Sequence, residues 1–131
     1  MDPNIFIDNL RRDKARGIIA PHQIVLLLAL YSLFRQTGKI HFNIEEVNSS
    51  FQLVWKENKD KFKSTNNNVG LPLKSLNSQG IIKLEIVSSI FDFRNLKNLN
   101  DGINKVNLTE VLLKVFHENS FTDKLKERLS K

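Results

Sequence analysis

The sequence contains no cysteine. This absence excludes disulfide bonds, thiolate zinc sites, iron–sulfur clusters and a cysteine nucleophile. Proline and glycine are scarce, with three and five residues, and they form neither a flexible linker nor a glycine-rich phosphate loop. The longest apolar run, from Ile24 to Phe34, is much shorter than the ~20 residues that a membrane span needs. We therefore expect a cytoplasmic protein with no membrane helix.

Groups that carry catalysis are equally sparse. The histidines His22, His41 and His117 have no partner at metal-ligand spacing, so we expect each to have a structural role. No His-Asn-His nuclease signature, zinc ligand set or serine nucleophile elbow occurs. We therefore expect no catalytic residue, metal or cofactor, and we do not expect this chain to act as an enzyme by itself.

What the sequence does have is a positive charge. Its 131 residues include 20 Lys and Arg against 14 Asp and Glu, for a net charge of +6. A small basic domain typically has an anionic partner, such as nucleic acid or an anionic membrane surface, although solubility alone is an alternative explanation. The candidate contacts to a DNA backbone are Arg11, Arg12, Lys14, Arg16 and Lys74.

Periodicity and capping signals predict mostly helices in a single domain spanning residues 1–131. The expected helices extend from Asp2 to about Arg12 with Ile5, Phe6 and Leu10 buried, from Pro21 to Gly38, from Asn43 into the charged run Lys56–Lys63, from Leu71 to Gly80, from Asn95 to Lys105, from Leu108 to Glu118, and from Ser120 to Leu129. Short strands are expected at Lys39–Phe42 and at Ile81–Val87, the second pairing with Ile90–Phe93 as a hairpin.

Two of these helices have strong local signals. The helix that begins at Pro21 is apolar on all sides, which is typical of a helix at the centre of a fold. Asn43 and Glu46 have the spacing of a capping box. The element order predicts a mainly α fold with a small β-hairpin, similar to a winged helix. Such folds insert a helix into the major groove of DNA and place the hairpin on its backbone.

The segment Ala20-Pro21-His22-Gln23-Ile24-Val25-Leu26-Leu27-Leu28-Ala29-Leu30 resembles a known family. In the N-terminal sulfur-binding domain of HNH-type restriction endonucleases, an Ala-Pro-His-(Lys/Arg)-Pro segment leads into a leucine-rich helix. Further matches follow in the same order: Gly38-Lys39-Ile40, then Phe51 and Trp55, then Leu71-Pro72-Leu73-Lys74-Ser75-Leu76, and a helical tail from about Leu108 to Leu129. The resemblance covers nearly the whole chain.

The resemblance implies binding of double-stranded DNA whose backbone carries a phosphorothioate, within a bacterial restriction system. It implies an apolar sulfur cup formed by Leu71, Pro72 and Ser75, with His22 and Gln23 at its rim. The DNA would be cut by an HNH nuclease domain or subunit, and we expect this chain to end where that domain would begin. The chain departs from the family pattern at Gln23, which replaces a basic residue, at Ile24, which replaces a proline, and at Leu71, which replaces an aromatic residue.

Three other functions remain as alternatives. The chain could be an ordinary winged-helix DNA-binding domain without a preference for sulfur. It could be a protein-interaction module of a defence complex, or part of a nuclease whose catalytic domain lies elsewhere. Binding to matched modified and unmodified DNA separates the first alternative from sulfur recognition.

Overall fold

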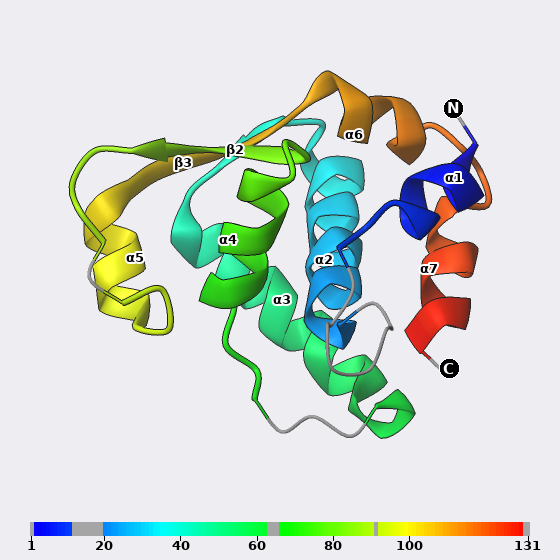
Figure 1. Ribbon diagram of the computed structural model, residues 1–131, viewed down its shortest axis with the longest axis horizontal. Coiled ribbons are helices and arrows are strands. Elements are labelled where there is room, and N and C mark those ends of the chain that lie inside the picture. The colour runs from blue at the N-terminus through cyan, green and yellow to red at the C-terminus, as the bar shows by residue number, and fades with distance from the viewer. Residues whose placement is uncertain (1, 12–19, 63–65, 91, 130–131) are drawn as a thin grey trace.

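Helix α2 (Pro21–Thr37) lies at the centre of the fold, as its apolar sequence predicts (Figure 1). Every residue from Ile24 to Leu30 is buried, because the helix has neighbours on several sides. These neighbours are α3 (Ile44–Asn58), α4 (Gly70–Ser78) and α7 (Phe121–Leu129). The predicted boundaries are confirmed, since Pro21 begins α2 and Gly38 ends it. The computed structural model describes residues 2–11, 20–62, 66–90 and 92–129.

The other elements surround this central helix. They are α1 (Pro3–Asp8), β1 (His41–Phe42), the 3₁₀ helix η1 (Lys59–Lys61), β2 (Ile82–Ile86), α5 (Leu96–Gly102), β3 (Ile103–Leu108) and α6 (Glu110–Phe116). In Figure 1, α1 and α7 lie on one side of α2 and α4 lies on the other. Among the described residues, no helix combines the length and the apolar character that crossing a bilayer requires.

A small sheet covers one end of the helices. Within the described residues it has three antiparallel strands in the order β1-β3-β2. Phe42, Val106 and Leu84 are aligned across the three strands, and all three are buried. Residues aligned across a sheet share a face, so this row turns toward the helical core. The chain is therefore a compact, mainly helical domain with a small antiparallel sheet.

The predicted hairpin is wrong in its second strand. The strand expected at Ile81–Val87 is confirmed as β2, but its partner is β3 and not Ile90–Phe93. The helix expected over Asn95–Lys105 ends at Gly102, and the chain continues directly as β3. The connection between the two paired strands therefore contains a helix, α5, where the sequence analysis expected a hairpin with Ile90–Phe93.

Gly102, the last residue of α5, lies in a place with no room for a side chain. A Cβ at this position would lie 2.5 Å from Ile90 Cγ1, so only glycine allows this close approach. The Gly102 carbonyl accepts a hydrogen bond from the Val87 N–H at 2.8 Å, which holds the end of α5 against the end of β2. Beyond this point, burial of Ile103 and Val106 on the core side of the sheet favours the strand over a longer helix.

The first helix is shorter than predicted. Asp2 caps it as expected, accepting a hydrogen bond from the Asn4 N–H at 2.8 Å, but α1 ends at Asp8. Phe6 is buried as expected, whereas Ile5 is 60% exposed. In a helix of this length only one narrow face contacts the core, so Ile5 points away from it.

The capping box predicted for α3 is present. The Asn43 side chain accepts a hydrogen bond from the Glu46 N–H at 2.8 Å, and the Glu46 carboxylate accepts one from the Asn43 N–H at 3.0 Å. The Asn43 N–H bond is the main cause of a lowered pKa at Glu46, followed by the hydrogen bond from Lys39. This capped helix contributes Phe51 and Trp55 to the core.

Glu46→Gln tests the contribution of this charge to stability. Because the folded-state pKa of Glu46 lies below its unfolded value, the ionised carboxylate stabilises the fold at neutral pH. The benefit is lost as the pH falls through the lowered pKa. We expect Glu46→Gln to cost below about 1 kcal/mol at pH 7 and nothing at a pH near 3. Urea denaturation at both pH values measures this, and an equal cost at both would contradict it.

Candidate functional site

A cavity of about 230 Å³, which we call the cup, lies between the first turn of α2 and α4. It contains all five residues that the sequence analysis assigned to sulfur and phosphate binding. Its lining consists of Ala20, His22, Gln23, Asn66, Asn68, Leu71, Pro72 and Ser75. Among the described residues, this lining contains no carboxylate, so no negative side chain would repel an anion there.

Helix α4 begins one residue earlier than the predicted start at Leu71, because Gly70 is its first residue. The Gly70 N–H donates to Asn68 Oδ1 at 2.8 Å, and a Cβ on Gly70 would overlap the carbonyl oxygen of Phe93. Pro72 still fits, because N–H groups in the first turn of a helix have no partner within the helix. As a result, Leu71 is 45% exposed at the cup while Pro72 is buried.

Gln23 lies at the base of the cup and not at the rim where the resemblance would place it. Its side chain is only 4% exposed, and its Nε2 donates to the Arg11 carbonyl at 2.7 Å. Its Oε1 accepts from Gln79 Nε2 at 2.8 Å and from Ser75 Oγ at 3.5 Å. Gln79 also accepts from the Arg11 N–H at 2.8 Å. Gln23 and Gln79 therefore fasten the backbone of Arg11 beside the base of the cup.

His22 connects α2 to the loop before α4. Its Nε2 lies 2.5 Å from the Asn66 carbonyl oxygen, and its ring centroid is 5.1 Å from that of Trp55. Nδ1 has no hydrogen bond within the described part of the chain. Among the described residues, no group of three His, Cys, Asp or Glu could hold a metal ion. His22 therefore supports the wall of the cup through Nε2 and its contact with Trp55.

The basic residues are placed unevenly. Lys74 is exposed on α4, and its Nζ lies 5.3 Å from the ring centroid of Phe93. Arg11 is also exposed, whereas Arg12, Lys14 and Arg16 lie outside the described residues.

The sequence analysis did not single out Arg94, which follows the predicted hairpin segment Ile90–Phe93. Asn68 Nδ2 donates a hydrogen bond to the Arg94 carbonyl. This bond holds the Arg94 backbone against the loop that lines the cup. The Arg94 side chain is 68% exposed, and its Nε lies 3.2 Å from Asp92 Oδ1. The pKa of Asp92 is lowered mainly by the hydrogen bond from the Arg94 backbone N–H and then by this side-chain contact. The hydrogen bond between Asn68 and Arg94 joins residues far apart in sequence, so no local signal predicts it.

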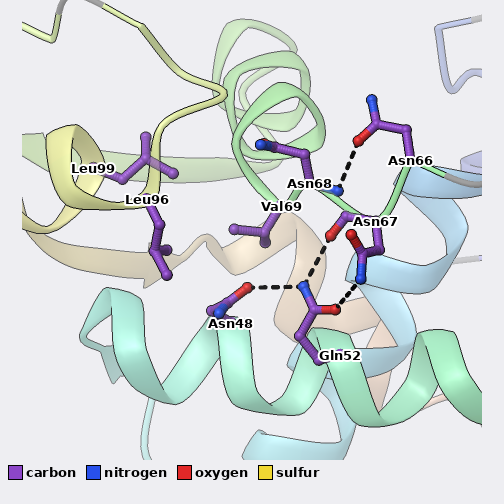
Figure 2. Close-up of a pocket in the computed structure, with 8 residues that line it drawn as sticks. All are labelled: Asn48, Gln52, Asn66, Asn67, Asn68, Val69, Leu96 and Leu99. Carbon is purple, nitrogen blue, oxygen red and sulfur yellow. Dashed lines mark hydrogen bonds between the residues drawn. The ribbon is translucent and has the colours of Figure 1, made fainter.

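A second cavity, of about 220 Å³, adjoins the cup and shares Asn66 and Asn68 with it. We call it the amide cavity, because Asn and Gln side chains form most of its polar lining (Figure 2). The sequence analysis assigned no role to the three consecutive asparagines, Asn66, Asn67 and Asn68. They lie immediately before α4, which has Pro72 in its first turn. This position is the one signal in the sequence that could have marked them as residues lining a cavity.

The sequence matches no protein-family model and no curated protein. The assignment of the cup therefore depends on its residues and geometry.

Gln23→Leu tests the hydrogen bonds that connect Gln23 to Arg11 and Gln79 at the base of the cup. The substitution removes the bond to the Arg11 carbonyl and one of the three bonds of Gln79 Nε2, which keeps its two bonds to Ser75. In this partly buried place the loss should cost about 1–2 kcal/mol. Gln36→Leu, on the exposed end of the same helix, is the matched control and should change stability by less than about 0.5 kcal/mol. Urea denaturation measures both variants. Equal effects would mean that the Gln23 bonds contribute little.

Proposed function

We propose that this chain is a DNA-binding module that recognises backbone-modified DNA, with the cup receiving a phosphorothioate. The observation that carries the proposal is the meeting of His22, Gln23, Leu71, Pro72 and Ser75, from two helices distant in sequence, around one cavity. The net charge of +6 adds a general attraction to a polyanion. We propose binding and not cleavage as its role, with cutting of DNA left to a nuclease domain or subunit.

The chemistry of the cup suits sulfur better than oxygen. A phosphorothioate replaces one non-bridging phosphate oxygen by a larger and less hydrated sulfur atom. Placing a hydrated oxygen against the Leu71 and Pro72 side chains would cost the oxygen its water without replacing it, whereas sulfur loses less. Polar groups of His22 and Ser75 are then close enough to the same cavity to contact the remaining phosphate oxygens.

We also propose that the fold is a winged helix. The order α2-β1-α3-α4-β2-β3, together with the sheet order β1-β3-β2, supports this assignment. In this arrangement, α4 is the helix that precedes the paired strands, and the segment between β2 and β3 is the wing. The wing would be unusually long, since it contains α5.

A protein-interaction module is the second candidate, and one observation favours it. Ile86 and Val87 are 51% and 63% exposed at the end of the edge strand β2. Exposed apolar residues on a sheet edge are a common place for another chain to pair. If this function is correct, the chain binds DNA weakly and independently of sulfur.

The salt dependence of DNA binding tests the electrostatic part of the proposal. The affinity should fall steeply with salt, and Lys74→Ala should reduce the magnitude of the log–log slope by about one unit if Lys74 contacts a phosphate. Lys126→Ala is the matched control, because α7 lies on the other side of α2 from α4 (Figure 1). Fluorescence anisotropy at several salt concentrations measures the slopes. Equal slopes for the two variants would remove Lys74 from the interface.

The ratio of affinities for matched phosphorothioate and phosphate duplexes tests the cup itself. Leu71→Asp places a negative charge beside the bound anion and removes an apolar wall, so the ratio should fall by about tenfold, equivalent to about 1.4 kcal/mol. Pro72→Ala removes part of the apolar surface and should reduce the ratio less. Leu53→Asp, at an exposed leucine on α3, makes the same charge change outside the cup and should leave the ratio unchanged.

Circular dichroism of each variant separates a lost cup from a lost fold. If the wild-type ratio is near one, or if the cup variants weaken both duplexes equally, sulfur recognition is wrong. An ordinary winged-helix DNA-binding domain would then be the better description.

A further inference from the structure

The amide cavity lies between α3, the loop before α4 and α5. Its lining residues are Asn48, Gln52, Asn66, Asn67, Asn68, Val69, Leu96 and Leu99. Figure 2 shows Leu96 and Leu99 on one side and the amide side chains of α3 and the loop on the other. Among the described residues, no charged side chain belongs to this lining. The cavity therefore offers hydrogen-bonding groups and an apolar wall to a neutral ligand.

Hydrogen bonds hold the polar side of this cavity in one arrangement. Gln52 Nε2 donates to the Asn67 carbonyl at 2.8 Å and to Asn48 Oδ1 at 3.1 Å, while Asn67 Nδ2 donates to Gln52 Oε1 at 2.7 Å (Figure 2). Gln52 thus fixes both the loop and the orientation of the Asn48 amide. A binding surface fixed before the ligand arrives loses less conformational entropy on binding.

The side-chain amides of Asn48 and Asn67 both have polar atoms that remain available to a ligand. Within the described residues, Asn48 Nδ2 and Asn67 Oδ1 have no hydrogen-bond partner, and Asn48 Oδ1 accepts only the one bond from Gln52. A carbonyl oxygen can accept two hydrogen bonds, so the Asn48 amide presents a donor and an acceptor side by side. Both Asn48 and Asn67 are accessible from outside.

We propose that the amide cavity binds a nucleobase, from a nucleotide adjoining the one held in the cup. A nucleobase is neutral and planar, with apolar faces and an edge of donors and acceptors, which matches this lining. Adenine fits best, because one amide can bond its N6 and N7 positions together. The inference rests on the proposed function, since the two cavities share Asn66 and Asn68 and a DNA strand in the cup would pass the amide cavity.

The test uses short phosphorothioate duplexes that differ only in the bases beside the modified phosphate. The wild-type protein should prefer adenine at one such position by about tenfold, the value expected for one bidentate amide contact. Asn48→Ala should reduce this preference to about twofold or less while leaving the phosphorothioate-to-phosphate ratio unchanged. Asn48→Asp keeps the shape but lacks the donor, so it should lose the preference as well. Ser49→Ala, the exposed neighbour on α3, is the matched control and should keep it.

A second measurement identifies how the base is presented. 2-Aminopurine is placed next to the preferred adenine, so that the adenine keeps its N6 and N7 groups. The probe becomes brighter if the adenine leaves the stack and enters the cavity, and stays dim if the adenine remains stacked. A brighter probe with the wild type and a dim one with Asn48→Ala supports the proposal, whereas a dim probe with the wild type overturns the nucleobase site. An intact sulfur ratio without any base preference in the wild type overturns the nucleobase site alone. A wild-type protein that binds no DNA overturns the proposed function together with it.

Discussion

The structure depends on the burial of α2 around its whole circumference. A helix with apolar residues on every side is shielded from water only if other elements cover several of its sides. Accordingly, α3, α4 and α7 all pack against α2. This packing fixes where the first turn of α2 lies relative to α4. The cup exists because that turn carries His22 and Gln23 while α4 carries Leu71 and Ser75. The position of the site is thus a consequence of core packing and not of any local motif.

In the part of the site that the structure describes, hydrogen bonds of neutral amides connect the residues, and no ion pair does. Gln23 and Gln79 join α2 and α4 to Arg11, and Asn68 joins the loop to Arg94. Hydrogen bonds from neutral amide side chains fix the relative positions of these segments without adding a charge that would attract or repel an anion. The positive side chains of Lys74 and Arg94 remain exposed around this neutral frame. Shape and charge are therefore provided by different residues.

Local signals predicted the features that are determined locally. The proline and glycine that bound α2, the capping box at Asn43, and the buried face of α3 all depend on a few neighbouring residues. Strand β3 could not be predicted in the same way. Its selection over a helix depends on pairing with β2 and on the contact of Gly102 with Ile90, which are distant in sequence.

The same distinction applies to the cup. The residues that line it could be named only through the family resemblance, because nothing local connects Pro21–Gln23 with Leu71–Ser75. Even so, the resemblance placed Gln23 at the rim, whereas its three hydrogen-bond partners place it at the base. The partners of a buried amide come from tertiary packing, which a pattern of residue types along the chain does not contain.

The two cavities share a wall, so the two proposed binding sites would depend on each other thermodynamically. Asn66 and Asn68 face both spaces, and the same short stretch is bonded to His22 on one side and to Arg94 on the other. A ligand that ordered this stretch from one side would reduce the entropy that a ligand on the other side must lose. If both proposed sites bind, their occupation would be cooperative, and because coupling is reciprocal each site would strengthen the other by the same factor.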